Sequence, residues 1–225
     1  MNTLPKVLCI VGPTSSGKTA LSLALAKRFQ GEIINADARQ IYRGFDIGTG
    51  KAKGEWIQKY DQDVYLVEGI SHFLIDHAYP DAVSTVAEWK TEALKYVHRI
   101  IERNHLPMIV GGTGLYIQSL VDSYEMPSVP PQPELRERMS QQSLPELIEE
   151  LRRMDPISAQ TIDLKNPRRV MRAIEVATVS GASFFEQRQK KAATVDPLFI
   201  AIQWTPEELR ERINKTIDQM LENGW

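Results

Sequence analysis

The chain contains a single cysteine among 225 residues, which excludes a framework of disulfide bonds within it. That residue, Cys9, lies in the apolar run VLCIV, and we expect it to be a small buried side chain. No apolar run reaches the roughly 18 residues that a membrane-spanning helix needs, and the first residues lack the pattern of a secretory signal. These absences predict a cytoplasmic protein with no membrane partner.

An excess of charge of either sign is also lacking. The 27 Lys and Arg residues nearly balance the 29 Asp and Glu residues, giving a formal net charge of −2. Binding to nucleic acid would therefore require a local basic patch. The four histidines are scattered, and no Cys/His cluster has the spacing of a zinc site.

The first half of the chain alternates short β-branched runs with helical periodicity. Strands are predicted at 6–11, 31–37 and 107–110, and helices at 17–29, 85–104 and 114–121. This alternation is typical of an α/β fold with a parallel sheet.

The composition changes near residue 124. A connector rich in proline is followed by residues 134–193, where helices are predicted at 143–155 and 167–181 and no strand is indicated. A buried strand is then predicted at 197–204, and a last helix begins after Thr205, with Glu208 completing a capping box. We therefore expect an α/β core (1–121), a helical insertion (122–194) and a return to the core (195–225).

The stretch GPTSSGKT lies between the first predicted strand and the first predicted helix. Its spacing, Gly-x4-Gly-Lys-Thr, matches a P-loop, in which backbone N–H groups and a helix N-terminus surround a phosphate. Lys18 adds a positive charge, and the Thr19 hydroxyl is a candidate Mg²⁺ ligand. The predicted phosphate-binding residues are Gly12, Pro13, Thr14, Ser15, Ser16, Gly17, Lys18 and Thr19.

Which phosphate binds there depends on acidic residues near the loop. The strand at 107–110 runs into GGTG and not into the carboxylate that many P-loop nucleotidases place there. The strand at 31–37 ends in Asp37, at the sheet edge where ligands of open α/β folds bind. By itself Asp37 is either catalytic or an ordinary aspartate at a strand end.

Five segments occur together in an order that resembles one enzyme family. They are GPTSSGKT, NADARQIYRGFDIGTGK, STVAEW, IVGGTGLYIQSLV and NPRRVMRAIEV. In this order they resemble the tRNA dimethylallyltransferases, also called tRNA isopentenyl transferases. The resemblance implies a P-loop NTPase-like parallel sheet with an inserted all-helical subdomain. It also implies transfer of a dimethylallyl group from dimethylallyl diphosphate to N6 of the adenine 3′ of the anticodon, in tRNAs that read codons starting with U.

The resemblance assigns catalytic roles to three residues. Asp37 matches the general base that takes a proton from the adenine amine. Thr113 matches a threonine near the adenine and the diphosphate; its alternative role is a helix N-cap. Arg212 resembles an arginine at the edge of the active site, a candidate for the diphosphate; its alternative is a solvated arginine on a helix face.

The resemblance also implies contacts with the anticodon stem-loop of tRNA. The target adenine must be flipped out of its stack to react. A basic stretch, KNPRRVMR, is the predicted backbone-binding patch, with a solvated helix face as its alternative. The predicted tRNA contacts are Asp37, Ala38, Arg39, Gln40, Thr113, Arg168, Arg169, Val170, Met171 and Arg172.

The sequence departs from the family at three places. Ala38 stands where members often have serine, and Thr216 stands where the last helix usually has a second arginine. Family members continue well past Trp225, so we expect either a fragment or a short member. We expect a monomer that uses Mg²⁺, and the same loop would also accept the phosphates of ATP.

Two other functions remain open at this point. One is a small-molecule kinase of the P-loop class, against which the GGTG strand end argues. The other is a protein that binds tRNA but no longer catalyses.

Overall fold

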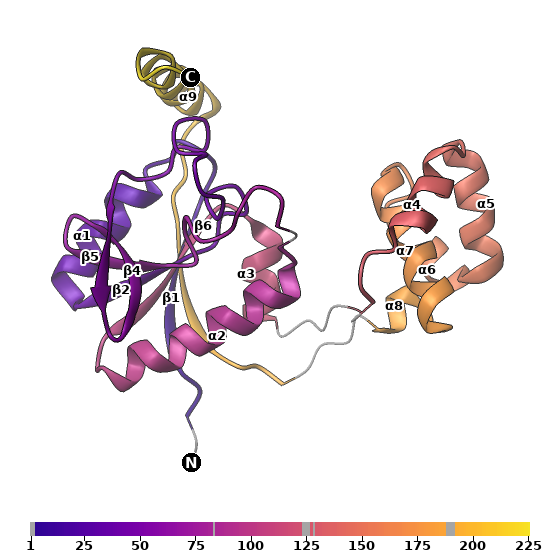
Figure 1. Ribbon diagram of the computed structural model, residues 1–225, viewed down its shortest axis with the longest axis horizontal. Coiled ribbons are helices and arrows are strands. Elements are labelled where there is room, and N and C mark those ends of the chain that lie inside the picture. Colours follow the sequence, from indigo (N-terminus) through magenta and orange to yellow (C-terminus); the bar gives the residue numbers. More distant parts are fainter. Residues whose placement is uncertain (1–2, 83, 123–126, 128, 188–191) are drawn as a thin grey trace. The chain divides into compact units, whose positions relative to one another are not determined.

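The chain forms two compact units (Figure 1). Unit 1 comprises residues 1–123 and 192–225, and unit 2 comprises residues 124–191. Among the residues described, no helix combines the length and apolar character needed to cross a membrane. The computed structural model describes residues 3–82, 84–122, 127, 129–187 and 192–225.

Unit 1 is built on a seven-stranded sheet in the order β3-β4-β5-β2-β6-β1-β7. The five strands from β5 to β7 in this order are parallel, and β3 and β4 are antiparallel to their neighbours. The strands are β1 (Lys6–Val11), β2 (Gly31–Asn35), β3 (Glu55–Lys59), β4 (Gln62–Val67), β5 (Ile70–Phe73), β6 (Leu106–Gly111) and β7 (Asp196–Ala201).

The predicted parallel sheet is confirmed for the strands from β5 to β7, whereas the antiparallel strands β3 and β4 were not predicted. Two-residue turns join β3 to β4 and β4 to β5, and a connection this short permits only antiparallel pairing. Tyr60 and Asp61 form the first turn and Glu68 and Gly69 the second, all with positive φ, as two-residue hairpins require.

Helices cover both faces of the sheet. The helix α1 (Lys18–Phe29) packs on one face through Leu23 and Ala26. On the other face α2 (Val86–Glu102) and α3 (Gly114–Val121) share a core with Cys9. Cys9 is fully buried, as predicted, and burial raises the pKa of its thiol to about 12.

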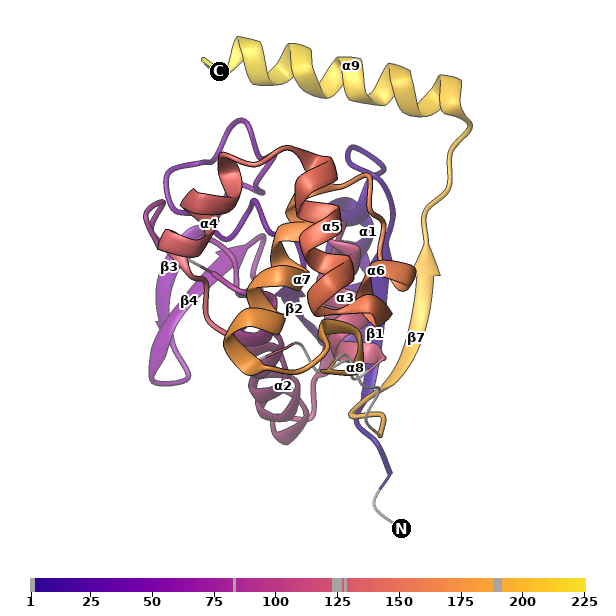
Figure 2. The same ribbon diagram turned by 90° about the vertical axis from the view of Figure 1, so that its right-hand side faces the viewer.

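The last strand of unit 1 differs from its prediction. We expected a buried strand, but β7 pairs only with β1 among the described strands and lies at the edge of the sheet. Leu198 and Phe199 remain 66% and 47% exposed. The helix α9 (Pro206–Glu222) follows along the end of the strands (Figure 2). Its predicted N-cap is confirmed, since Thr205 and Glu208 form the capping box.

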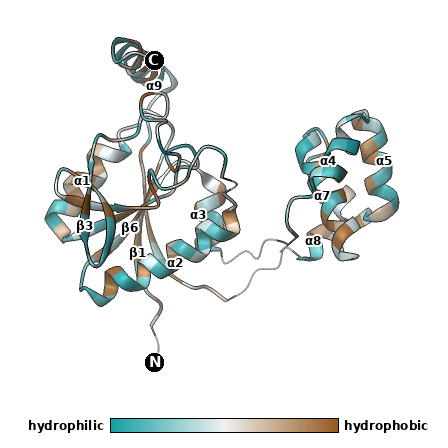
Figure 3. Ribbon diagram, in the orientation of Figure 1, coloured by the Kyte–Doolittle hydropathy of each residue, from teal (hydrophilic) through white to brown (hydrophobic). Residues whose placement is uncertain are grey.

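Unit 2 consists of helices in its described part. A shared apolar core includes Leu151, Val170 and Ile174, and the hydrophobic stretches of these helices are visible in Figure 3. Of the predicted connector, residues 124–126 and 128 lie outside the described residues. The helices are α4 (Pro133–Ser140), α5 (Leu144–Met154), α6 (Pro156–Thr161), α7 (Pro167–Ser180) and α8 (Phe184–Gln187). The sequence predicted α5 and α7, and the shorter helices were missed.

Candidate active site

The predicted phosphate-binding loop joins the end of β1 to the start of α1. Gly17 directly precedes α1 with φ 99°, and Ser15 also has a positive φ of 62°. The Ser16 hydroxyl is buried, and among the described residues it has no hydrogen-bond partner. A loop that turns back on itself before a helix N-terminus, with an unpartnered buried hydroxyl, is a suitable cradle for an anion.

Lys18 folds back over this loop. Its Nζ donates hydrogen bonds to the carbonyl oxygens of Gly12 (3.0 Å) and Pro13 (2.8 Å). Burial lowers the pKa of Lys18 below its ordinary value, and the nearby Asp37 carboxylate partly opposes that shift. Lys18 and Asp37 therefore lie close enough for their charges to interact.

Asp37 lies just beyond the carboxyl end of β2, and Asn35 holds its backbone in place. The Asn35 Nδ2 group donates to the carbonyl oxygens of Asp37 (3.1 Å) and Leu74 (2.9 Å), and its Oδ1 accepts from the Asp37 N–H (3.2 Å). The Trp89 indole donates to the Asn35 carbonyl at 2.8 Å. Sequence reasoning missed Asn35 and Trp89; the available signal was an amide side chain ending an otherwise apolar strand.

Thr113 joins the end of β6 to the segment after Asp37. Its Oγ1 accepts a hydrogen bond from the Ala38 N–H at 2.9 Å, and its own N–H donates to the Ala36 carbonyl at 3.0 Å. Thr113 occupies the N-cap position of α3, but its side chain makes no capping hydrogen bond. The N-cap position is therefore confirmed, and the Thr113 hydroxyl bonds to the segment after Asp37 and not to the helix.

The close approach of the end of β6 to the Ala36 backbone depends on Gly111, which has no side chain. A Cβ atom at Gly111 would lie 2.2 Å from the carbonyl carbon and oxygen of Ala36. Glycine is therefore required for the GGTG segment to reach the segment that follows Asp37.

The loop that follows Asp37 is fastened to the end of β5. Arg39 is exposed and donates its backbone N–H to Asp37 Oδ1 at 2.9 Å. Further along, Lys51 is almost fully buried and pairs with Asp46 (2.7 Å) and Asp76 (2.5 Å). Burial would lower the pKa of Lys51, but the hydrogen bonds and charges of the two carboxylates outweigh it and raise that pKa.

Gln40 is part of the same fastening. Its Nε2 donates to the Thr49 carbonyl at 3.2 Å, and its own carbonyl accepts from the Asp76 N–H at 2.9 Å. The segment predicted to contact the adenine is thus held by its own loop and by the residues after β5.

Arg212 extends from α9 to the phosphate-binding loop. Its Nε donates to the Ser15 carbonyl at 2.9 Å, and its guanidinium lies 4.4 Å from the centroid of the Trp204 ring. The Trp204 indole donates to the Ser16 carbonyl at 2.9 Å. Arg212 is therefore not the solvated helix-face arginine of the alternative. Thr216 has no positive charge to offer, and its hydroxyl donates a hydrogen bond to the Arg212 backbone carbonyl of the same helix.

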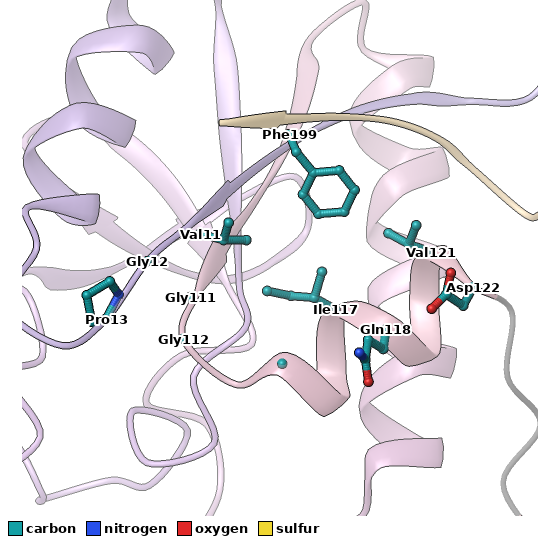
Figure 4. Close-up of a pocket in the computed structure, with 11 residues that line it drawn as sticks. Val11, Gly12, Pro13, Gly111, Gly112, Ile117, Gln118, Val121, Asp122 and Phe199 are labelled. Atoms are coloured by element: carbon teal, nitrogen blue, oxygen red, sulfur yellow. The ribbon is translucent and has the colours of Figure 1, made fainter. Parts of the chain in front are cut away.

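A pocket of about 570 Å³ adjoins the phosphate-binding loop within unit 1. Gly12, Pro13, Gly111 and Gly112 line it with backbone, and Gln118 and Asp122 line it with polar side chains (Figure 4). Its apolar side chains surround the same space in Figure 4; they are Val11, Ile117, Val121 and Phe199.

The predicted basic patch lies on α7 in unit 2, and its residues differ in their surroundings. Arg168 and Arg169 are exposed in the first turn, while Val170 is buried. Arg172 is used internally: it pairs with the buried Glu175 at 2.6 Å and donates to the Val129 carbonyl at 2.9 Å. Met171 is half-buried and packs against the core of unit 2.

No cluster of three or more His, Cys, Asp or Glu side chains suited to a metal ion occurs in the part of the chain that the structure describes. Mg²⁺ that binds together with substrate phosphates usually takes only one or two protein ligands. The Thr19 hydroxyl, in the first turn of α1, is the candidate protein ligand.

Comparison with known proteins identifies the family. The family model described as IPP transferase matches residues 40–225. The chain belongs to the IPP transferase family. It is 40% identical over 221 residues to a tRNA dimethylallyltransferase of Anoxybacillus flavithermus, a match that covers 97% of this chain and 68% of that relative. A tRNA dimethylallyltransferase of Acetivibrio thermocellus is 41% identical over 228 residues, covering 98% and 70% of the two chains.

Solved structures of IPP transferases agree with this assignment. The tRNA delta(2)-isopentenylpyrophosphate transferase of Staphylococcus epidermidis is 37% identical with a TM-score of 0.59, and the match covers 98% of this chain and 70% of that one. A eukaryotic dimethylallyltransferase acting on tRNA is 28% identical with a TM-score of 0.77, covering 97% and 53%. The P-loop fold class predicted from the sequence is thereby confirmed.

Proposed function

We propose that this chain transfers a dimethylallyl group from dimethylallyl diphosphate to N6 of the adenine 3′-adjacent to the anticodon, in tRNAs that read codons beginning with U. Membership of the IPP transferase family, whose relatives are named for this transfer to tRNA, supports the proposal. The observation that carries it is that the phosphate-binding loop, Asp37 and Thr113 meet at the carboxyl ends of β1, β2 and β6. A phosphate cradle beside a carboxylate suits a reaction that releases pyrophosphate while a proton is removed.

The phosphate-binding loop holds the diphosphate in this proposal. Charge builds on the pyrophosphate oxygens as the bond to the allylic carbon breaks, and the groups positioned to receive it are Lys18, Arg212 and the loop N–H groups. Mg²⁺, held by the Thr19 hydroxyl and the phosphates, would neutralise part of that charge when bound. The apolar side of the pocket beside Gly12 offers a surface for the five-carbon chain.

The adenine amine is the nucleophile. Its lone pair is delocalised into the ring, so attack requires a group that removes a proton as the new bond forms. N6 bonds to the first carbon of the dimethylallyl group, the bond from that carbon to the diphosphate oxygen breaks, and one N6 proton passes to the Asp37 carboxylate. Thr113 positions the segment that carries this carboxylate, through its hydrogen bond to Ala38.

Two regions are assigned to the tRNA. Residues 37–40 receive the flipped adenine and its neighbours, because they lie on the loop that begins at the general base. Arg168 and Arg169 contact the phosphate backbone, since both are exposed and basic. The structure offers no such freedom to Arg172, whose guanidinium is used within unit 2. The proposal includes a monomer acting in the cytoplasm.

Asp37→Asn tests the proposed base. The amide keeps the size of the side chain and one oxygen that can accept from the Arg39 N–H, but it cannot take a proton, so prenyl transfer should fall by about 10²- to 10⁴-fold. Binding of the anticodon stem-loop and of dimethylallyl diphosphate should remain near wild type. A decrease of only a few-fold would contradict the assignment, and a transfer that required ATP hydrolysis would favour the kinase alternative.

A further inference from the structure

Two aromatic rings surround an arginine of the loop that follows Asp37. The guanidinium of Arg43 lies 5.5 Å from the centroid of the Trp56 ring and 5.2 Å from that of the Tyr79 ring. The three residues come from the loop after β2, from β3 and from the segment after β5. We call them the Arg43 cluster.

Hydrogen bonds to one residue fix two of these side chains. Asp76 accepts from the Arg43 Nε through its carbonyl oxygen (3.1 Å) and from the Trp56 indole through Oδ2 (3.0 Å). The other carboxylate oxygen of Asp76 pairs with the buried Lys51. The cluster is thus ordered before any ligand arrives, which lowers the entropy cost of binding.

The rings are nevertheless accessible. Trp56 is 39% exposed and Tyr79 is 62% exposed, although both are held in fixed contact with Arg43. Single exposed aromatic side chains are common, but two ordered rings in contact with one exposed guanidinium form a surface on which a planar group can stack. Trp56 also packs against the buried Tyr65, with ring centroids 5.4 Å apart, so the more accessible ring of the cluster is that of Tyr79.

Backbone hydrogen bonds also join the segments of the cluster to the loop that holds the candidate adenine-contacting residues. The Asp76 N–H donates to the Gln40 carbonyl at 2.9 Å, and the Arg43 N–H donates to the Ala78 carbonyl at 2.8 Å. Lys51 and Arg43 balance the carboxylates of Asp46 and Asp76, so these four side chains carry no net negative charge that would repel the RNA backbone.

We propose that the Arg43 cluster is a stacking platform for an unpaired base of the anticodon loop, adjacent to the adenine that reaches Asp37. Unpaired RNA bases are bound by stacking on aromatic rings and on guanidinium planes, the two kinds of surface that this cluster presents. This inference rests on the proposed function, because it takes tRNA as the substrate.

Tyr79→Ala is the principal test, measured as the affinity for an unmodified anticodon stem-loop RNA. Loss of one stacked base should weaken that affinity by about 5- to 100-fold, while Tyr79→Phe, which keeps the ring, should bind like wild type. Phe29→Ala is the matched control: Phe29 is 53% exposed beside Arg28 (5.7 Å), at the opposite end of α1 from the phosphate-binding loop. It should leave the affinity unchanged, and all three variants should melt like wild type.

RNAs with one abasic position in the anticodon loop form the second arm. At the position that stacks on the cluster, the abasic RNA should bind wild type and Tyr79→Ala equally, since the base is already missing. Equal affinity of wild type and Tyr79→Ala for the intact RNA would overturn the proposal. So would a difference between the two proteins that survives at every abasic position. Failure of the wild-type protein to bind the RNA at all would instead count against the proposed function.

Discussion

Replacing Gly111 by alanine would test whether the close approach of β6 to the segment after β2 builds the active site. The new Cβ would lie 2.2 Å from the Ala36 carbonyl, whereas ordinary van der Waals contact begins at about 3.4 Å. The two backbones must therefore separate by about 1 Å, the difference between these distances. The carbonyl carbon and oxygen of Ala36 are backbone atoms, so they cannot rotate away as a flexible side chain could.

That separation acts directly on Thr113. Its hydrogen bonds to Ala36 and Ala38 measure 3.0 and 2.9 Å, and an added displacement of about 1 Å would break both. Overpacking of this kind typically costs about 1–3 kcal/mol, and each lost hydrogen bond adds about 1 kcal/mol. We expect Gly111→Ala to lower the free energy of unfolding by about 3–5 kcal/mol. A misplacement of about 1 Å near the reacting groups should lower kcat on the order of 10²-fold.

Urea unfolding and single-turnover prenyl transfer would measure the two effects. Gly114→Ala is the matched control, because a Cβ there meets no described atom within 4 Å. It should leave the free energy of unfolding near wild type; because Gly114 also lines the pocket, it is a control for stability alone. If Gly111→Ala matched this control in stability and the wild-type protein in rate, the close approach would not be what positions Thr113.

Three further predictions concern charged groups. Replacing Arg168 and Arg169 by alanine should weaken tRNA binding and lower its salt dependence, −dlog K/dlog[salt], by roughly 0.7–0.9 per lost contact; Arg172→Ala should instead lower the melting temperature, and an unchanged salt slope in the double variant would remove α7 from the tRNA-binding surface. Glu32→Ala should lower the free energy of unfolding in urea by about 1.5–3 kcal/mol, because it removes hydrogen bonds from Arg103 and His105 to a buried carboxylate; a loss under about 0.5 kcal/mol would contradict this. Burial lowers the pKa of His72 below its ordinary value, so the unfolded chain binds more protons and stability should fall as the pH drops below about 6.5; His72→Gln should flatten that fall, and an unaltered pH profile would show that another group causes it.

The phosphate-binding loop was predictable because its signal is local. The glycines, Lys18 and Thr19 occur at fixed spacing between an apolar run and a helical pattern, and each acts through its own backbone or side chain. The capping box of α9 was predictable for the same reason, since Thr205 and Glu208 lie three residues apart.

Three features were missed, each for a different reason. The turns at Tyr60–Asp61 and Glu68–Gly69 lack the Asn-Gly or Asp-Gly signal of a tight hairpin, so the antiparallel strands were not indicated. The exposure of Phe199 depends on what covers β7, not on the residues of the strand itself. The pairing of Arg172 with Glu175 could have been inferred, since residues three apart on a helix are neighbours.

The contacts of Trp204 and Arg212 with Ser15 and Ser16 have a thermodynamic consequence. Both side chains bind carbonyl oxygens of the phosphate-binding loop, so they favour one conformation of the loop whether or not phosphate is bound. Since α9 has no buried residue of its own, these contacts are a large part of what fixes its start to the core. A ligand that requires this loop conformation must therefore strengthen the attachment of α9, and α9 must strengthen the binding of the ligand by the same coupling free energy. If only the attached state bound the ligand, the attachment would gain about 2.7 kcal/mol at a ligand concentration of a hundred times Kd. Protection of the α9 backbone from hydrogen exchange would then rise with the concentration of diphosphate, and the helix would serve as a remote reporter of occupancy.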